Sequence, residues 1–304
     1  MILLYHGVIP NDSPVERLCV GQALTQMAFE RHVKWLVSRY RIVSLEEYLE
    51  DKRKEAPRYG GPIALTFDDG FNSTFQCVFP FLVESNLPAA IFVSTGHLDG
   101  GELLWFSYLK ALCFENLYPE VHVNSRIFPL RTLKQRKQSW VSLCALAKSS
   151  GSLIKFCKKM AETYPLPLEI QALYGGMTNK QVQQAVESGI IELGAHTVTH
   201  PYLAQISEAD QKREIEMSQC VLGELSGKPI RYFAYPGGDY TRVTAKLVQA
   251  ARFDASFAVI SNNIAPDPFY EIERIGIYSP SLLKLKLKTL GITHWARQFG
   301  LRVG

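Results

Sequence analysis

The chain has 304 residues, of which 47% are hydrophobic and 20% are charged, and its formal net charge is +4. This composition predicts an ordinary soluble protein that can bury a sizeable core without disulfide bonds. Because the charge excess is small and no basic cluster is interleaved with aromatic residues, nucleic-acid binding is not expected.

The N-terminal segment and the cysteines bear on where the protein works. The first residues, MILLYHGVIPNDSP, contain no basic region and only a four-residue apolar run, too short for a signal-peptide core. No stretch reaches the roughly 18 apolar residues that a membrane span requires. The six cysteines are scattered without C-x-x-C pairs, which favours reduced, buried thiols. We therefore expect a cytoplasmic protein, or a secreted or periplasmic one if a leader has been removed.

The first hundred residues alternate between strand and helix patterns. Buried strands are predicted at 2–5, 41–43, 62–67 and 88–94. Helical spacing covers 27–40 and 74–85, and Ser44 followed by Glu47 resembles a capping box that opens another helix. The strand–helix–strand order predicts parallel strands in an α/β sheet or barrel.

The pattern changes from about residue 98 to about residue 176. Helical periodicity dominates this stretch, at 102–116, 132–149 and 152–163. We interpret it as a helical insertion in a single domain that spans 1–304.

Strand and helix patterns alternate again after the insertion. Thr178 is an N-cap for a predicted helix at 179–188, and two more helices are predicted at 207–226 and 241–252. Strands are predicted at 190–196, 231–236, 255–260 and 273–278. A C-terminal helix at about 281–300 is both basic and apolar, so it is expected to pack on the protein or to contact a membrane surface.

Acidic residues follow one of the strongest predicted strands. Asp68 and Asp69 come directly after 62–67, at the strand end where catalytic groups of α/β barrels gather. Two adjacent carboxylates need a counter-charge, and a divalent cation on one of them would leave the other free as a base. The sequence Asp-Asp-Gly is also common in simple turns.

Two histidines follow a later strand. His196 and His200 are four residues apart and would share one face if the segment forms a helical turn. Each would then offer an imidazole nitrogen to a shared metal, and with an aspartate they would form a two-histidine, one-carboxylate set. Two ordinary loop histidines are the alternative.

Two further motifs are weak by themselves. The segment RYFAYPGG at 231–238 could direct backbone N–H groups at an oxyanion, or it could be a plain strand-to-helix turn. His6 directly follows a buried strand and, taken alone, is more simply a hydrogen-bonded edge residue.

The motifs TFDDG, HTVTH and FAYPGG, in this order, resemble the polysaccharide deacetylases of the NodB-homology class, carbohydrate esterase family 4. The resemblance covers roughly 1–97 and 177–278. It implies an α/β fold, a distorted (β/α) barrel of the NodB-homology type, to which the helical insertion is added.

The resemblance also implies roles for individual residues. Asp68 would be the general base, and Asp69, His196 and His200 would hold a divalent metal, by default Zn2+, with Ni2+, Co2+ or Fe2+ as alternatives. A circularly permuted branch, similar to the poly-N-acetylglucosamine deacetylases, carries its acid histidine after the first strand. By this resemblance His6 would be the general acid.

The chain departs from the family pattern at one motif. Many relatives have R-P-P-Y-G where this chain has AYPGG, so Ala234 replaces an arginine that would orient the base. Either of two other arginines would have to supply the charge, and the Gly237 backbone is the expected oxyanion donor. The expected substrate and oxyanion contacts are Arg231, Arg274, Tyr235, Pro236 and Gly237.

The predicted function is therefore metal-dependent removal of N-acetyl groups from amino sugars. The expected partner is an N-acetylated glycan or a lipid-linked or nucleotide-linked precursor of a cell-surface polysaccharide. One alternative is an amide hydrolase of the same fold that acts on a small non-sugar molecule beneath the insertion. The other is a non-catalytic glycan-binding module, which is disfavoured because base, ligands and candidate acid are all present.

Overall fold

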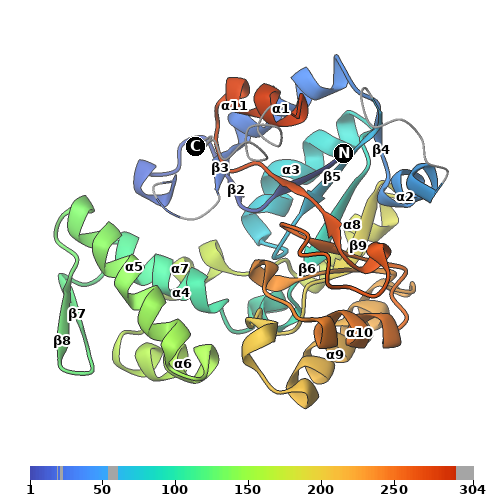
Figure 1. Cartoon of the computed structure of the whole chain (residues 1–304). Helices are drawn as coiled ribbons and strands as arrows, with labels where there is room; N and C mark the ends of the chain where they lie inside the picture. Colours follow the sequence, from blue (N-terminus) through green and yellow to red (C-terminus); the bar gives the residue numbers. More distant parts are fainter. Residues whose placement is uncertain (19, 21–22, 54–60, 292–304) are drawn as a thin grey trace.

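A nine-stranded parallel sheet forms the centre of the computed structural model, which describes residues 1–18, 20, 23–53 and 61–291 (Figure 1). The strand order is β12-β11-β10-β9-β6-β5-β1-β13, and β4 also pairs with β5. These strands are β1 Ile2–Tyr5, β4 Ile42–Val43, β5 Ile63–Phe67, β6 Ala89–Val93, β9 Ile191–Ala195, β10 Tyr232–Ala234, β11 Ala255–Ala258, β12 Ile272–Glu273 and β13 Ile275–Gly276.

The sheet curls into a nearly closed barrel. Its two outermost strands, β12 and β13, are the halves of one extended segment with Arg274 between them. β12 pairs with β11 and β13 pairs with β1, so this segment joins the two ends of the strand order. The predicted α/β class and distorted (β/α) barrel are confirmed.

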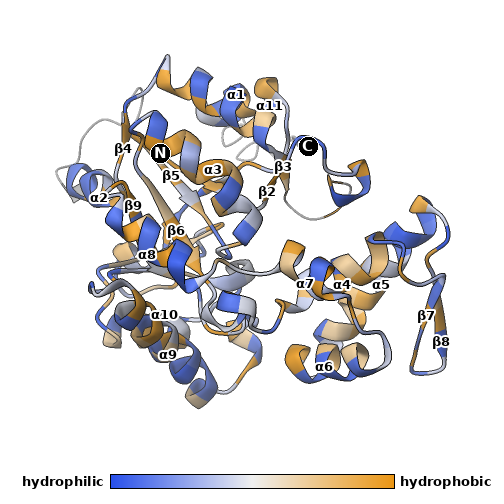
Figure 2. Cartoon of the chain, turned by 180° about the vertical axis from the view of Figure 1, so that it is seen from behind, coloured by the Kyte–Doolittle hydropathy of each residue, from blue (hydrophilic) through white to orange (hydrophobic). Residues whose placement is uncertain are grey.

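Helices surround the barrel close to their predicted positions. They are α1 Gln26–Val37, α2 Leu45–Arg53, α3 Asn72–Glu84, α8 Asn179–Glu187, α9 Glu208–Ser226, α10 Arg242–Ala250 and α11 Leu282–Thr289. Thr178 caps α8 in a capping box with Gln181. Figure 2 shows hydrophobic and hydrophilic residues side by side along α9 and α10, as expected for helices with one face on a core.

The central strands are apolar along their whole length. All five residues of β5 and of β6 are buried, because parallel strands are covered on both faces. A short parallel pair, β2 Val8–Ile9 and β3 Leu24–Thr25, lies outside the main sheet. The barrel core thus explains why these segments show continuous apolar runs rather than alternation.

Residues 105–174, called the insertion below, form a separate group of elements to one side of the barrel (Figure 1). Its helices and strands are α4 Trp105–Phe114, β7 Glu120–Val123, β8 Arg126–Pro129, α5 Leu133–Ser149, α6 Leu153–Thr163 and α7 Leu168–Tyr174. They share an apolar cluster that includes Leu109, Leu112 and Leu143.

The insertion is not purely helical, and in this respect the prediction was wrong. β7 and β8 form an antiparallel hairpin whose central residues, Asn124 and Ser125, have positive φ angles of 48° and 58°. Such angles are typical of a type I′ turn, which Asn favours. The Asn-Ser pair lies between two short segments of alternating apolar residues, in the gap between the helices predicted at 102–116 and 132–149, and it was the sequence signal for this hairpin.

The C-terminal helix is shorter than predicted within the described residues. α11 ends at Thr289, and the predicted part from 292 to 300 lies outside the described residues. Among the described helices, none combines the length and the apolar character needed to cross a membrane. The five described cysteines are free, and all but Cys220 are buried, whereas Cys19 lies outside the described residues.

Candidate metal centre and active-site cavity

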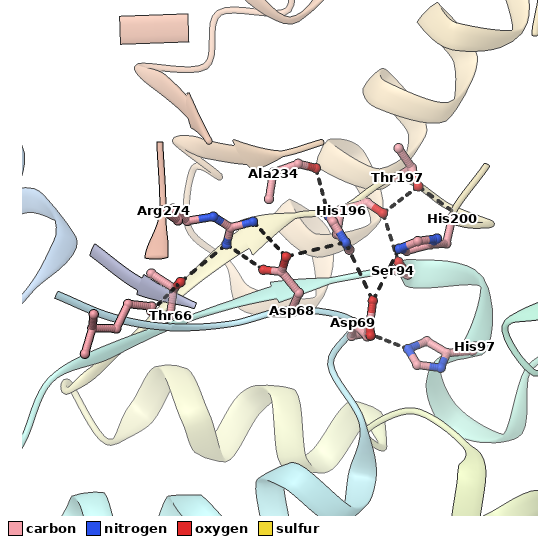
Figure 3. Close-up of polar contacts among 11 residues, drawn as sticks. Thr66, Asp68, Asp69, Ser94, His97, His196, Thr197, His200, Ala234 and Arg274 are labelled. Atoms are coloured by element: carbon pink, nitrogen blue, oxygen red, sulfur yellow. Dashed lines mark hydrogen bonds and ion pairs between the residues drawn. The ribbon is translucent and has the colours of Figure 1, made fainter. Parts of the chain in front are cut away.

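Asp69, His196 and His200 lie together at the carboxyl ends of β5 and β9 (Figure 3). The Oδ1 atom of Asp69 is 3.6 Å from Nε2 of His196 and 3.4 Å from Nε2 of His200. All three side chains are buried. The structure therefore brings the three predicted metal ligands to one point.

The chemistry of this triad fits a divalent cation. Asp69 Oδ1 is buried and accepts no hydrogen bond. Burial and the neighbouring Asp68 raise the pKa of Asp69 well above its usual range, and burial and His196 lower the pKa of His200 well below its own. Two ligand bonds of about 2.1 Å at a tetrahedral angle separate their donor atoms by about 3.4 Å, close to the observed distances. These residues can thus hold zinc or a similar ion.

His196 has the correct tautomer for this role. Its Nδ1 donates a hydrogen bond to the Ala234 carbonyl oxygen at 2.8 Å. The Nε2 lone pair then points toward Asp69, which is the arrangement of a metal-binding histidine held by a backbone carbonyl. Ala234 stands where many relatives have an arginine, and its backbone carbonyl oxygen is what orients His196.

The predicted helical turn at His196–His200 is wrong. The segment is an irregular loop in which Thr197 and His200 have positive φ angles of 67° and 55°. The Glu214 carboxylate, on α9, accepts hydrogen bonds from the backbone N–H groups of Val198 and Thr199 at 2.8 and 2.9 Å. This buried glutamate therefore holds the loop in place of helical hydrogen bonds.

Asp69 is held by a residue that the sequence analysis did not identify. Its φ angle is 75°, an unusual value for a residue other than glycine. The buried His97 donates from Nε2 to the Asp69 carbonyl oxygen at 2.6 Å. Neither His97 nor Glu214 belongs to a recognisable motif, so only their contacts identify them.

Asp68 forms a buried ion pair with Arg274 (Figure 3). The two guanidinium nitrogens donate to Oδ1 and Oδ2 at 2.6 and 2.7 Å. Burial by itself raises the pKa of Asp68, but Arg274 and His196 outweigh it and lower the pKa to about 2. Asp68 is therefore ionised at neutral pH.

Of the two arginines that the sequence offered, the structure places only Arg274 in the site. Arg231 lies at the other end of β10, where it pairs with Glu46 and Asp254. Its side chain is 42% exposed, and it makes no contact with Asp68. The expectation that Arg231 contacts substrate does not agree with this position.

His6 lies beside the triad at the end of β1. Its ring is partly buried, faces the Tyr278 ring at a centroid distance of 5.7 Å, and has no hydrogen-bond partner at Nδ1. Burial lowers the pKa of His6 to about 4, while the Asp68 carboxylate acts in the opposite direction. The free imidazole is therefore neutral at pH 7.

The turn after β10 contributes backbone rather than side chains. The Tyr235 ring is buried against Tyr240, and its hydroxyl donates to the Tyr270 carbonyl oxygen. Its side chain therefore does not face the site, although the sequence analysis expected it to contact the substrate. Pro236 is buried and has no N–H. Gly237 lines the cavity with a φ angle of 61°, and a Cβ there would approach the Tyr202 ring to 2.9 Å.

A cavity of about 300 Å³ lies between the barrel and the insertion. On the barrel side it is lined by Asp69, His200, His6 and Gly237. On the other side it is lined by aromatic residues of the insertion, Trp105, Phe106 and Trp140. The Phe106 ring meets the His200 ring edge to face at 5.0 Å, so this wall begins directly at a candidate metal ligand.

Comparisons with known proteins agree with this architecture. Residues 150–256 match the family model for polysaccharide deacetylase. The deacetylase PplD of Streptococcus pyogenes, in complex with acetate, is 20% identical with a TM-score of 0.55, over 95% of this chain and 96% of that chain. IcaB of Ammonifex degensii is 18% identical with a TM-score of 0.60, over 95% of this chain and 96% of that chain.

A third solved structure, the de-N-acetylase of Aggregatibacter actinomycetemcomitans, is 15% identical with a TM-score of 0.53, over 90% of this chain and 92% of that chain. At these identities the likeness concerns the fold. No curated protein matches the sequence significantly.

Proposed function

We propose that this chain is a polysaccharide deacetylase that removes N-acetyl groups from amino sugars of a glycan or glycan precursor with the help of a divalent metal. Asp69, His196 and His200 would hold that metal. One observation carries the proposal: the unpartnered, buried Asp69 oxygen faces two imidazole nitrogens directly beside the ionised Asp68.

Asp68 is proposed as the general base. Amide hydrolysis needs an activated water, because water is a weak nucleophile at neutral pH. Arg274 keeps Asp68 deprotonated and fixes its orientation through two hydrogen bonds. When bound, a divalent cation would lower the pKa of its water and polarise the acetamide oxygen, which compensates for the low basicity of a carboxylate with a pKa of about 2.

His6 is proposed as the general acid for the departing amine. It lines the same cavity as Asp69 and His200, and its Nδ1 has no other partner. Because the free imidazole is neutral, the proton must reach it after the substrate binds. The Asp68 carboxylate favours the protonated ring, and the proton that Asp68 takes from the attacking water would pass on to His6, since a carboxyl group with a pKa of about 2 holds it weakly.

The Gly237 N–H is proposed as an oxyanion donor. The next two N–H groups, of Gly238 and Asp239, donate to the carbonyl oxygens of Tyr235 and Pro236 within the turn. Gly237 lies on the cavity wall, where a backbone donor can approach the developing negative charge.

The test is acetate release from a panel of N-acetylated sugars, with and without a chelator. Asp68→Asn is expected to lower turnover by at least about 100-fold, because a general base contributes this much or more. Its metal content, measured by elemental analysis, should equal that of the unmodified protein. Arg231→Gln is the control, and it should retain full activity because its guanidinium lies outside the site.

Two outcomes would contradict this proposal. Normal turnover by Asp68→Asn would remove Asp68 from its role as base. Turnover that a chelator does not reduce would rule out the metal-assisted reaction.

A second candidate function is hydrolysis of a small non-sugar amide. The observation that favours it is the insertion wall, which covers the site with Trp105 and Phe106 and so suits short substrates. Including small N-acetylated amines in the panel separates the two functions, because acetate release from these compounds alone would favour the second.

A further inference from the structure

We infer that α1 and α11 together form a docking face for a membrane surface that contains anionic lipids. This α1–α11 face is defined by six exposed residues, which are Met27, Arg31 and Lys34 of α1, Leu283 and Lys284 of α11, and Leu290 at the end of α11. None of the six lines the active-site cavity, so the face is independent of the proposed function.

The leucines of α11 form a stripe that faces solvent. Leu283, Leu287 and Leu290 recur at intervals of four and three residues, so they share one side of the helix. Such a stripe normally packs on a core, yet Leu283 is 65% and Leu290 is 56% exposed, and Leu287 is only partly buried. α11 instead buries Leu285 and Thr289. The part of the chain that the structure describes therefore leaves the regular apolar side of α11 uncovered.

α11 is held against α1, so the exposed sides of the two helices belong to one surface. The Lys286 ammonium lies 5.6 Å from the centroid of the Trp35 ring on α1. Arg31 Nη2 donates to the Pro280 carbonyl oxygen, just before α11, at 2.6 Å, and the His32 ring nitrogen Nε2 lies 3.3 Å from the same oxygen. Figure 1 and Figure 2 both show the two helices side by side at one end of the molecule.

α1 adds apolar and cationic side chains to this surface. Met27, Arg31 and Lys34 also recur at intervals of four and three residues, and so lie on one side of α1. Met27 is 63% exposed and the Lys34 side chain is 69% exposed. Glu30, the one acidic residue of α1, lies 3.7 Å from the Lys34 ammonium and accepts a hydrogen bond from Gln26.

The charge of the two helices has one dominant sign. Their sequences contain five basic residues and a single acidic one, Glu30. The five are Arg31, Lys34, Lys284, Lys286 and Lys288. Even with Glu30 ionised, the helices carry an excess of four positive charges beside the exposed leucines. This surface therefore attracts anions.

An anionic lipid surface matches both properties of the face. Its headgroups offer negatively charged oxygens to the lysines and Arg31, and the acyl chains directly beneath them accept the leucines. Dissolved anions would neutralise the cations but leave Leu283 and Leu290 in water. The combination of one-sign charge and a short apolar stripe is typical of helices that lie in the plane of a membrane surface.

A second copy of the chain is a poorer partner for this face. A two-fold symmetric contact would place the same residues opposite themselves. Lys34 and Lys284 would then approach the corresponding cations of the other copy, and like charges facing each other across an interface oppose association. We therefore assign the face to a membrane and not to a dimer.

Sedimentation of the full chain with lipid vesicles tests this assignment. The protein is expected to bind vesicles of phosphatidylcholine mixed with phosphatidylserine more tightly than vesicles of phosphatidylcholine alone, and added salt should weaken the binding. Lys284→Gln should lower the affinity for the mixed vesicles about fivefold, the effect of one lysine near an anionic surface. The double variant Leu283→Ser with Leu290→Ser should lower it about tenfold or more, because it removes most of the apolar contact.

Two exposed residues of the insertion provide matched controls. Leu168 on α7 is 79% exposed and precedes the acidic Glu169, so Leu168→Ser should leave vesicle binding unchanged. Lys134 is an exposed lysine of the basic helix α5, and Lys134→Gln should also have no effect. All substituted positions are exposed, so the Tm of each variant should equal that of the unmodified protein.

Three results would overturn the inference. The first is equal binding to vesicles with and without phosphatidylserine, or no binding to either. The second is an equal loss of binding in Lys134→Gln and Lys284→Gln, which would indicate attraction by the net charge alone. The third is a dimer in sedimentation equilibrium that the double leucine variant dissociates, because the face would then belong to a second copy.

The outcome is separable from that of the proposed function. Acetate release from a soluble substrate by the double leucine variant should equal that of the unmodified protein, since neither leucine lines the cavity. Vesicle binding without acetate release from any substrate would contradict only the proposed function. Acetate release without vesicle binding would contradict only the docking face.

Discussion

Arg231 and Arg274 are equivalent candidates in the sequence but lie in opposite surroundings. The Arg274 side chain is fully buried and its partner Asp68 is 3% exposed. Arg231 is 42% exposed, and its partners Glu46 and Asp254 are 53% and 39% exposed. A buried charge that loses its partner cannot be solvated, whereas water and salt screen an exposed one.

Arg274→Gln is therefore expected to lower the free energy of unfolding by about 3–5 kcal/mol. Arg231→Gln should lower it by no more than about 1 kcal/mol. Urea denaturation measures both values. Equal effects of the two substitutions would show that the Arg274–Asp68 pair is not as buried as described.

The same pair determines a pH dependence. Burial raises the pKa of Asp68, and Arg274 and His196 lower it from 3.8 to about 2. Since the folded-state pKa is below the unfolded value, Asp68 adds stability above pH 3.8 that is lost as the pH falls through about 2. Without Arg274, burial dominates, so the acidic limb of kcat/KM in Arg274→Gln should move to higher pH. An unshifted limb would exclude Asp68 as the titrating base.

At the scale of elements, the loop between β9 and α9 depends on the helix that follows it. Glu214 accepts two backbone hydrogen bonds and one from the Thr199 hydroxyl, at 2.7 Å, so α9 holds the two residues that precede His200 in the segment between the histidines. Thr197 assists, because its hydroxyl oxygen accepts from the His200 N–H at 3.1 Å. The positions of the metal ligands therefore depend on contacts outside the ligands themselves.

Glu214→Gln is expected to weaken zinc binding about tenfold or more, the usual effect of removing an outer-shell partner. Both backbone N–H groups donate to Oε2 and the Thr199 hydroxyl donates to Oε1. Glutamine can keep the two backbone bonds only with an uncharged oxygen, which makes them weaker, and its NH₂ group cannot accept from the Thr199 hydroxyl. Competition with a chromogenic chelator measures the affinity. Glu216→Gln is the control, since this residue is exposed on the same helix and pairs with Lys212. Equal zinc affinities of the two variants would show that Glu214 does not position the ligands.

At the scale of the whole molecule, the metal site joins segments that are far apart in the chain. Asp69 follows β5, and His196 and His200 follow β9, while the segment 272–276 closes the barrel beside them. Without a cation, Asp69 has a raised pKa, so its ionisation costs stability at every pH above its ordinary range. A bound metal removes that cost and links both strand ends.

Chelation should therefore lower the Tm by at least about 5 °C, because a saturating ligand adds several kcal/mol of stability. The difference should be larger at pH 7.5 than at pH 5.5. As the pH rises, Asp69 ionises in the metal-free protein, and protons compete less with the metal for the histidines. Scanning calorimetry at both pH values measures the effect, and a Tm insensitive to chelation would argue against a bound metal.

The amino-acid sequence determined much of this protein by itself. The strands β1, β5, β6 and β9 were predictable because both of their faces are buried, which requires an apolar run. Local hydrogen bonding made the N-cap at Thr178 predictable. The motifs around Asp68, Asp69, His196 and His200 pointed to one site because each follows a predicted strand.

Only the tertiary structure decided which distant residues complete that site. Arg274 meets Asp68 across 206 positions of the chain, because barrel closure brings the segment 272–276 beside β1 and β11. His97 and Glu214 hold the ligands through backbone contacts that no residue pattern announces. Local preferences act over a few residues, whereas these partners are selected by the packing of the whole barrel.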